Sequence, residues 1–231
     1  MNVITSVANL LFPPMCFSCN ERLENSTILC NNCIDQLIDL EGIRCTFCHK
    51  EISHGFICDE CKTIYPFDEV VCAYMYNSPI QSMIHHFKYN EFKKIGTYLG
   101  KRLADKLSHY DFTRNTDYII PVPLHRTKER FRGFNQAEII AKAISKSIKI
   151  PILSDVIRRK KFTQTQTKLD HTEREKNVAD AFILKDSEIL KKKSILLVDD
   201  VLTTGSTMKS IALLLKENLA AHVYVCTLAR A

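Results

Sequence analysis

Long apolar runs and a basic leader are both missing from this chain of 231 residues. No apolar stretch approaches the roughly 20 residues that a membrane-spanning helix needs. The apolar residues from Val3 to Leu11 recur at helical spacing, have no basic residues before them and stop at Pro13. They predict a short helix that packs on a neighbour. We therefore expect neither an integral membrane protein nor an exported one, and place the protein in the cytoplasm.

Cysteine is abundant by contrast, and eight of the ten cysteines form four Cys-x-x-Cys pairs. Each pair can supply two metal ligands from one tight turn. Two pairs about ten to fifteen residues apart can form a tetrahedral zinc site with four thiolate ligands. A disulfide framework needs an oxidising compartment, which nothing else in the chain suggests. We therefore expect two structural Zn²⁺ ions in two zinc ribbons. The predicted ligands are Cys16, Cys19, Cys30, Cys33, Cys45, Cys48, Cys58 and Cys61.

The way in which the four pairs combine stays open at this point. Consecutive pairs give two separate ribbons, but a crossed combination, first with third and second with fourth, is also compatible with the spacing. His49 and His54 could replace a thiolate, but eight sulfurs already fill two sites, which favours surface histidines. Cys72 and Cys226 lie in apolar, strand-like runs and are predicted to be buried packing residues.

Net charge changes sign along the chain. Residues 1–66 hold four Lys and Arg against eight Asp and Glu, a net charge of −4, and residues 67–231 hold 28 against 18, a net charge of +10. This predicts an N-terminal double zinc-ribbon domain over 1–66 and a basic domain over 67–231. Because zinc thiolates add negative charge, the ribbon domain is unsuited to clamp a phosphate backbone, and we expect a structural lid or a docking surface.

Strand and helix patterns alternate through the basic domain. Apolar segments predict strands, and apolar residues at helical spacing predict helices between them. The strands are expected at 70–76, 118–122, 195–198 and 222–228, and the helices at 79–88, 91–108, 134–148 and from 208 onward. This alternation predicts a mostly parallel, doubly wound α/β sheet.

The strand at 195–198 runs directly into two carboxylates, Asp199 and Asp200. Open α/β sheets bind ligands at the carboxyl ends of their strands. The next turn supplies backbone N–H groups, hydroxyls and a glycine free to adopt positive φ, and a helical face follows it. A helix N terminus that is capped in this way attracts phosphate. The segment therefore predicts a ribose-phosphate site. The residues of the turn are Thr203, Thr204, Gly205, Ser206 and Thr207.

Two basic loops accompany this site. The first, at 123–136, places four cations within seven residues around Phe131 and follows a predicted strand. A solvated basic turn has the same composition, but the position at the carboxyl end of a strand favours an anion site with a stacking ring. The second loop runs from Arg158 to Phe182 and is polar and basic, with little periodicity. It suits a mobile lid over an anionic ligand, with a disordered linker as the alternative.

Residues 195–207 closely resemble the fingerprint with which type I phosphoribosyltransferases bind 5-phosphoribosyl 1-pyrophosphate (PRPP). The resemblance implies a type I phosphoribosyltransferase-like fold, with Asp199 and Asp200 on the ribose hydroxyls and the turn from Thr203 to Thr207 around the 5-phosphate. Mg²⁺ would arrive with the pyrophosphate, so no dedicated protein cage is needed. The second basic loop lies where the flexible catalytic loop of these enzymes lies.

Further motifs narrow the resemblance to the ComF family of competence proteins, and the similarity covers nearly the whole chain. It implies the handling of incoming single-stranded DNA during natural transformation, beside a helicase-like partner and other competence proteins. It does not establish a transferase reaction. Besides the cysteine pairs and the fingerprint, the motifs are Pro-Val-Pro-Leu-His-Arg at 121–126, Arg-Gly-Phe-Asn-Gln at 132–136, and Gln-Thr-Gln-x-x-Leu at 164–169 followed by Arg174 and Asn177.

Two functions from different classes are compatible with these residues. In the first, a DNA-handling protein uses the PRPP-type pocket and the basic loops to hold phosphates of single-stranded DNA or of a regulatory nucleotide. Bases can then stack on aromatic rings that lie among the cations, although several of these rings have helical spacing and could be core. The aromatic residues are Phe87, Tyr89, Phe92, Phe131, Phe134 and Phe162.

In the second, the protein is an active Mg²⁺-dependent phosphoribosyltransferase with an unknown acceptor. Asp199 and Asp200 would hold the sugar, while loop cations close over the departing pyrophosphate and stabilise its charge. The candidate cations are Arg126, Lys161 and Arg174. An adaptor with a vestigial pocket is a third interpretation, and the intact carboxylates and hydroxyls weigh against it.

Overall fold

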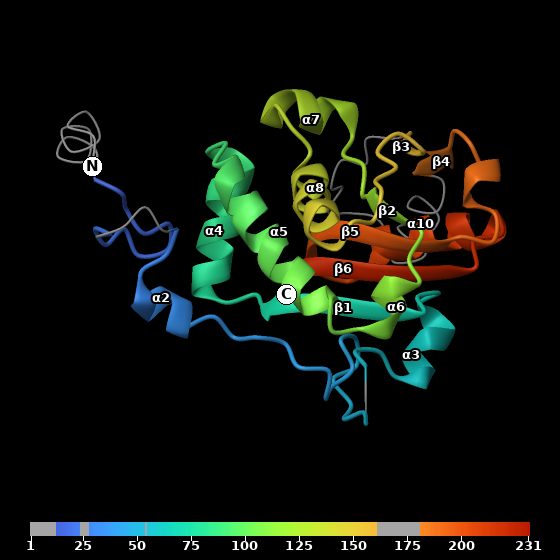
Figure 1. Cartoon of the computed structure of the whole chain (residues 1–231), viewed down its shortest axis with the longest axis horizontal. Helices are drawn as coiled ribbons and strands as arrows, with labels where there is room; N and C mark the ends of the chain where they lie inside the picture. Colours follow the sequence, from blue (N-terminus) through green and yellow to red (C-terminus); the bar gives the residue numbers. More distant parts are fainter. Residues whose placement is uncertain (1–12, 24–27, 54, 161–180) are drawn as a thin grey trace, which may run out of the picture.

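A four-stranded parallel sheet forms the centre of the molecule. The structure is a computed structural model that describes residues 13–23, 28–53, 55–160 and 181–231. Its strands lie in the order β1-β6-β5-β2, and all three neighbouring pairs are parallel (Figure 1). The bounds are Glu69–Met75 for β1, Tyr118–Pro121 for β2, Ser194–Leu202 for β5 and His222–Arg230 for β6.

The two central strands are buried along most of their length. The apolar runs at 195–198 in β5 and at 223–226 in β6 are buried at every residue. Strands of this kind need a covering layer on both faces of the sheet. Beyond β2, Ile152 forms a parallel bridge with Ile119, so one further short segment extends the sheet.

Helices supply both covering layers. On one face lie α4 (Ser78–Tyr89), α5 (Lys93–Leu107) and α8 (Gln136–Ile148), and on the other lies α10 (Ser206–Glu217) (Figure 1). Right-handed crossovers require this division, because the chain moves across the sheet in one direction from β1 to β2 and in the other from β5 to β6. The direction reverses between β2 and β5. A reversal of this kind opens a crevice at the carboxyl ends of the two strands.

Shorter elements surround this core. The antiparallel pair of β3 and β4 flanks residues 161–180, which lie outside the described ranges. Within those ranges, no helix has both the length and the apolar character of a membrane span. The shorter elements are α2 (Asn31–Asp35), α3 (Asp59–Ile64), α6 (Asp111–Arg114), α7 (Arg126–Arg132), β3 (Ile157–Arg159), β4 (Phe182–Leu184) and the 3-10 helix η1 (Glu188–Leu190).

The parallel, doubly wound sheet confirms the predicted fold class, and each strand and helix expected within the described part has a counterpart there. Two expectations need correction. β5 extends to Leu202, so Asp199 and Asp200 belong to the strand and do not follow it. The loop expected at 123–136 contains the helix α7. The short helix expected near the N terminus lies outside the described residues.

α7 forms because both of its ends are capped. Nδ1 of His125 accepts a hydrogen bond from the N–H of Thr127 at the start, and Gly133 adopts the left-handed conformation, with φ of 78°, at the end. No residue of α7 is buried. The helix therefore has no apolar stripe, which is the feature that reveals a helix in a sequence.

The segment between the two cysteine-rich regions pairs with the outer edge of β1. The N–H of Leu40 donates to the carbonyl oxygen of Ala73 over 3.1 Å, and the N–H of Met75 donates to the carbonyl oxygen of Ile38 over 2.9 Å. This pairing covers a sheet edge that would otherwise expose unpaired backbone groups. It also fixes the cysteine-rich regions beside the sheet.

Candidate functional site

Asp199 and Asp200 lie near the carboxyl end of β5, beside the switch point of the sheet. The N–H of Asp200 donates to Oδ1 of Asp199 over 2.8 Å. Nζ of Lys88, on α4, lies 2.9 Å from Oδ1 of Asp200, and the side chains of this pair are 20% and 6% exposed. The structure therefore adds a partly buried cation, Lys88, to the two carboxylates.

Sequence reasoning missed Lys88, although a signal was present. Lys88 follows Ile80 and Ile84 at intervals of four residues, so it continues the buried stripe of α4. A cation in an apolar stripe indicates a buried partner, because an unpaired charge is rarely buried.

The carboxylate pair has unsatisfied bonding capacity. Oδ2 of Asp200 is buried and has no hydrogen-bond partner among the described residues. A buried polar atom of this kind is costly and indicates a place for a ligand group. At Asp199, burial and then the charge of Asp200 raise the pKa from 3.8 to about 7. The site favours a ligand that donates hydrogen bonds or carries positive charge, such as a diol or a metal ion.

The turn after β5 has the features expected of a phosphate-binding loop. Gly205 adopts φ of 77° as the N-cap of α10, a conformation that glycine reaches without a Cβ penalty. The hydroxyls of Thr204 and Ser206 lie 2.8 Å apart, and both residues are exposed. Thr203 is also exposed, and Thr207 is half-buried. The hydroxyls and N–H groups at this helix N terminus can donate hydrogen bonds to the oxygens of a phosphate.

Of the three cations predicted to lie on the loops, the structure describes one. Arg126 begins α7 and is exposed. Lys161 and Arg174 lie outside the described residues. Arg159, which the sequence did not single out, ends β3 with its guanidinium 5.4 Å from the ring of Phe182. Burial lowers the pKa of Arg159, and the charge of Asp199 opposes that change, so the guanidinium is close enough to interact with this carboxylate.

The first basic loop lies at the same end of the sheet as the carboxylates. The N–H of Val122 donates to the carbonyl oxygen of Val198 over 2.9 Å, which places the start of this loop next to Asp199. Nδ2 of Asn135 donates back to the carbonyl oxygen of Val122 over 3.0 Å, so the end of the loop returns to the same point. α7 projects from this loop.

The candidate stacking residues separate into core and surface. Phe87 and Phe134 are buried, and their rings stack at 5.6 Å, so both belong to the core. Tyr89 is 58% exposed and Phe131 is 88% exposed. Phe92 is partly exposed but packs on the ring of Phe17 at 4.7 Å. Phe162 lies outside the described residues.

Each group of four cysteines forms one compact site, which resolves the open pairing as consecutive. Within each group the Sγ atoms lie within 4.8 Å of one another. The pairs Cys19/Cys30 and Cys48/Cys58 bring their sulfurs to 3.6 Å, close to the about 3.8 Å edge of a tetrahedron with Zn–S bonds of about 2.3 Å. Four thiolates at this spacing fit Zn²⁺. The first site is Cys16, Cys19, Cys30 and Cys33, and the second is Cys45, Cys48, Cys58 and Cys61.

The two sites repeat one backbone geometry. The N–H of Cys30 points to Sγ of Cys16 at 3.4 Å, and that of Cys58 points to Sγ of Cys45 at 3.4 Å. Burial disfavours the thiolate of Cys45, but backbone N–H bonds outweigh burial and lower its pKa to about 6. These N–H groups favour the thiolate of Cys45, which is the form that binds a metal. His49 is exposed and outside the ligand set, as expected, and His54 lies outside the described residues.

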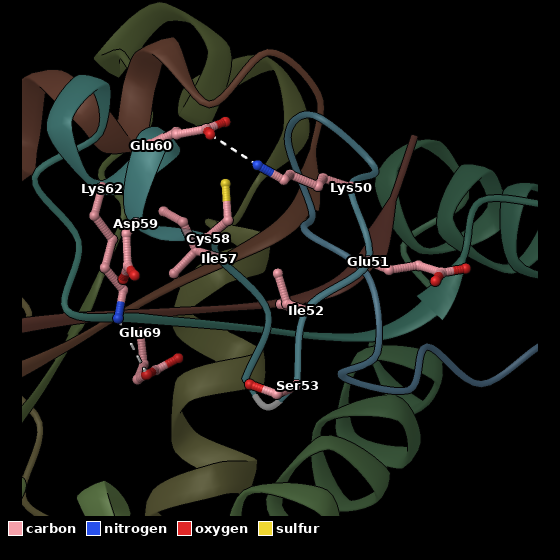
Figure 2. Close-up of a pocket in the computed structure, with 10 residues that line it drawn as sticks. All are labelled: Lys50, Glu51, Ile52, Ser53, Ile57, Cys58, Asp59, Glu60, Lys62 and Glu69. Carbon is pink, nitrogen blue, oxygen red and sulfur yellow. Dashed lines mark hydrogen bonds and ion pairs between the residues drawn. The ribbon is translucent and has the colours of Figure 1, made fainter.

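A hollow of about 340 Å³ opens beside the second zinc site (Figure 2). Two ion pairs lie at its wall, Lys50 with Glu60 at 2.8 Å and Lys62 with Glu69 at 3.6 Å. Four acidic side chains line it against two basic ones, which does not suit a phosphate. None of the predicted ribose-phosphate residues lines this hollow.

Comparison with known proteins agrees with both parts of the molecule, the two cysteine groups and the parallel α/β sheet. A family model described as a double zinc ribbon domain matches residues 7–74, and one described as a phosphoribosyl transferase domain matches residues 132–231. Competence protein F of Haemophilus influenzae is 34% identical over 212 residues, which cover 88% of this chain and 90% of that protein. The chain belongs to the ComF family.

Other relatives extend this result. DNA utilization protein YhgH of Shigella flexneri is 30% identical over 227 residues, which cover 96% of this chain and 99% of that protein. A solved glutamine PRPP amidotransferase from B. subtilis, in complex with ADP and GMP, is 21% identical, with a TM-score of 0.40 over 57% of this chain and 25% of that one. The two matching family models and the two groups of four cysteines show that this ComF protein combines a type I phosphoribosyltransferase fold with an N-terminal double zinc ribbon.

Proposed function

We propose that this ComF protein handles incoming single-stranded DNA in the cytoplasm during natural transformation and uses its PRPP-type pocket to hold a ribose-phosphate group. One observation carries the proposal. The carboxylates, with Oδ2 of Asp200 left without a hydrogen bond from any described residue, lie at the same end of the sheet as the exposed basic helix α7. The names of the relatives, a competence protein and a DNA utilization protein, support the role in DNA handling.

α7 and the end of α4 have the chemistry of a surface for single-stranded nucleic acid. The ring of Phe131 is exposed between Arg130 and Arg132, and the guanidinium of Arg132 lies 5.5 Å from the ring centre of Tyr89. Exposed rings can stack on bases of any sequence, while the cations follow the phosphates. This arrangement supports sequence-tolerant binding to single strands.

The proposed site would take a ribose 5-phosphate unit together with Mg²⁺. Asp199 and Asp200 would accept hydrogen bonds from the ribose hydroxyls, and the turn from Thr203 to Thr207 would hold the phosphate. Mg²⁺ would offset the charge of a pyrophosphate without further protein ligands. The proposed ligand is PRPP, a nucleotide or a related phosphate compound.

The acidic zinc-ribbon region is proposed to dock protein partners. Residues 1–66 carry a net charge of −4, and zinc thiolates make this region more negative. It would repel a nucleic-acid backbone and suits the basic surface of a helicase-like partner or of another competence protein.

Binding to single-stranded DNA across a salt series tests the proposal. The zinc-loaded protein is titrated with an unstructured oligo-dT at increasing NaCl, and we expect the logarithm of the binding constant to fall linearly with the logarithm of salt. Duplex DNA of the same length serves as the comparison, and it should bind less tightly because its bases cannot stack on Phe131. Failure to bind the single strand even at low salt would refute DNA handling.

A second candidate function, transfer of a phosphoribosyl group from PRPP, is favoured by the same carboxylates. Oδ2 of Asp200, which has no hydrogen-bond partner within the described part of the chain, and the carboxyl of Asp199 beside it are suited to accept hydrogen bonds from the hydroxyls of the sugar. The test is release of pyrophosphate from PRPP and Mg²⁺ with a panel of bases and amines. Release that disappears in the Asp199→Asn, Asp200→Asn variant supports transfer, and its absence with every acceptor in the panel rejects transfer to those acceptors.

A further inference from the structure

Three aromatic rings connect the second zinc site to the rest of the molecule. Phe47 lies between the ligands Cys45 and Cys48, and its ring stacks on Tyr65 with centroids 3.8 Å apart and planes at 16°. Phe67 completes the group at 6.0 Å from Phe47 and 5.8 Å from Tyr65. The turn that carries two of the metal ligands therefore contributes one ring, Phe47, to an aromatic cluster.

These rings lie directly against the turn from Thr203 to Thr207, which we call the phosphate turn. A Cβ added at Gly205 would be 2.9 Å from Cε1 of Phe47 and 3.3 Å from Cε1 of Tyr65, so both rings touch the backbone of the turn. The hydroxyl of Tyr65 donates to the carbonyl oxygen of Thr204 over 3.3 Å. Nζ of Lys209, in the first turn of α10, lies 5.8 Å from the ring centre of Tyr65.

Arg230 provides a second connection between the turn that holds Cys45 and Cys48 and the turn from Thr203 to Thr207. Nε of Arg230 donates to the carbonyl oxygen of Thr46 over 2.8 Å, and its Nη1 donates to that of Leu202 over 3.2 Å. Thr46 precedes Phe47 in the zinc turn, and Leu202 ends β5, where the phosphate turn begins. The zinc turn is thus fixed to the phosphate turn from two sides.

The first zinc site has a different neighbour. Phe17 occupies the equivalent place between Cys16 and Cys19, but it contacts α4: Oγ of Ser82 donates to its carbonyl oxygen over 2.8 Å, and its ring meets that of Phe92 at 4.7 Å. The two ribbons repeat one geometry, and among the described residues only the second ribbon lies against the turn at 203–207. Phe17 is therefore a matched control for Phe47.

We propose that Phe47 and Tyr65 are positioning residues through which the second zinc site holds the phosphate turn in its binding shape. Zn²⁺ fixes the turn that carries Phe47, and the ring in turn limits the conformations open to Gly205, a residue with unusual backbone freedom. Occupancy of the second site, and not of the first, then controls the affinity for a phosphate. The affinity part rests on the proposed ribose-phosphate function, whereas the positioning part does not.

Hydrogen exchange of the backbone at 203–207 tests the positioning directly, without any ligand. It is measured on the full-length, zinc-loaded wild type and on the Phe47→Ala and Phe17→Ala variants, each with its zinc content determined. In Phe47→Ala, loss of the aromatic contact should speed exchange in the turn about tenfold while two zinc ions stay bound. Phe17→Ala should leave exchange in the turn unchanged. Phe47→Tyr, which keeps the ring, should behave like the wild type.

The same variants then report on affinity, with PRPP and Mg²⁺ as the probe. We expect PRPP binding to weaken about tenfold in Phe47→Ala and not in Phe17→Ala. If Phe47→Ala does not fold, Tyr65→Phe, which keeps the stack but loses the bond to Thr204, takes its place with a smaller increase in exchange. Equal exchange in the turn for the wild type and the Phe47 or Tyr65 variant overturns the proposal. A wild type that does not bind PRPP argues against the ribose-phosphate function, and exchange still decides the positioning.

Discussion

Lys88 on α4 and Asp200 on β5 form a partly buried ion pair across 112 positions of sequence, with 2.9 Å between Nζ and Oδ1 and the carboxylate as the buried member. Removal of one member leaves the other charge buried and unpaired. Lys88→Met, which keeps the aliphatic stem, should therefore lower the free energy of unfolding by about 3 kcal/mol. A double-mutant cycle with Asp200→Asn should give a coupling above about 1 kcal/mol.

The matched control for this cycle is the pair of Arg44 and Glu51. Its atoms lie 3.1 Å apart, but its side chains are 62% and 81% exposed. A cycle on that pair should show no measurable coupling, because solvent screens it. Equal coupling in both cycles would contradict a special role for Lys88.

Asp199 should make the protein less stable as pH rises. Its pKa is raised from 3.8 to about 7 in the folded state, so between these values the folded state binds more protons than the unfolded state. The free energy of unfolding then decreases from about pH 4 to pH 7 and levels off above that range. Asp199→Asn should remove this slope and stabilise the protein at pH 8 by on the order of 2 to 4 kcal/mol.

Urea unfolding at pH 5, 6, 7 and 8 measures this effect. Asp155→Asn, at a carboxylate with an exposed side chain (92%), is the control and should keep the slope of the wild type. A parallel shift of Asp199→Asn at every pH, with the slope unchanged, would show that Asp199 does not cause the pH dependence.

The two zinc sites should be independent. The purified protein should hold two Zn²⁺ per chain, and Cys16→Ser and Cys45→Ser should each lose one, because the groups of four do not share ligands. Metal analysis after a chelator wash measures the content. Cys72→Ser, at a fully buried cysteine outside both groups, should keep two. Loss of both ions from Cys16→Ser alone would contradict separate sites.

The surface formed by α7 should contribute to DNA binding in two distinguishable ways. Arg130→Ala should weaken binding and reduce the magnitude of the salt slope by about one, because one phosphate contact is lost. Phe131→Ala should cost about 1 to 3 kcal/mol without changing the slope, because stacking does not release ions. Fluorescence anisotropy with labelled oligo-dT measures both. Lys146→Ala, at an exposed position at the far end of α8, should have neither effect.

The sequence predicts the sheet, the two groups of four cysteines and the turn at 203–207 because each has a local signature. A buried parallel strand is a continuous apolar run, as at 195–198, and a zinc site with four cysteine ligands is two close pairs. Gly205 is recognisable because glycine reaches positive φ without a Cβ penalty, and it adopts φ of 77° here. These features depend on neighbours in the chain.

The remaining parts of the site depend on tertiary contacts that leave little local trace. The pairing of Lys88 with Asp200 and the position of Phe47 against Gly205 arise only when distant elements pack together. Phe87 and Phe131 look alike in a list of aromatics near cations, yet one is core and the other is exposed. The difference follows from α7, a capped helix with no buried residue.

Titration calorimetry with PRPP and Mg²⁺ tests the central claim, a working ribose-phosphate pocket in a DNA-handling protein, most directly. The zinc-loaded wild type should bind one PRPP per chain, and the Asp199→Asn, Asp200→Asn variant with two zinc ions should show no binding. Repetition with saturating oligo-dT should produce a measurable shift in PRPP affinity, because α7 and the carboxylates of Asp199 and Asp200 lie at the same end of the sheet. A zinc-loaded wild type that binds no PRPP, with or without oligo-dT, would contradict the claim.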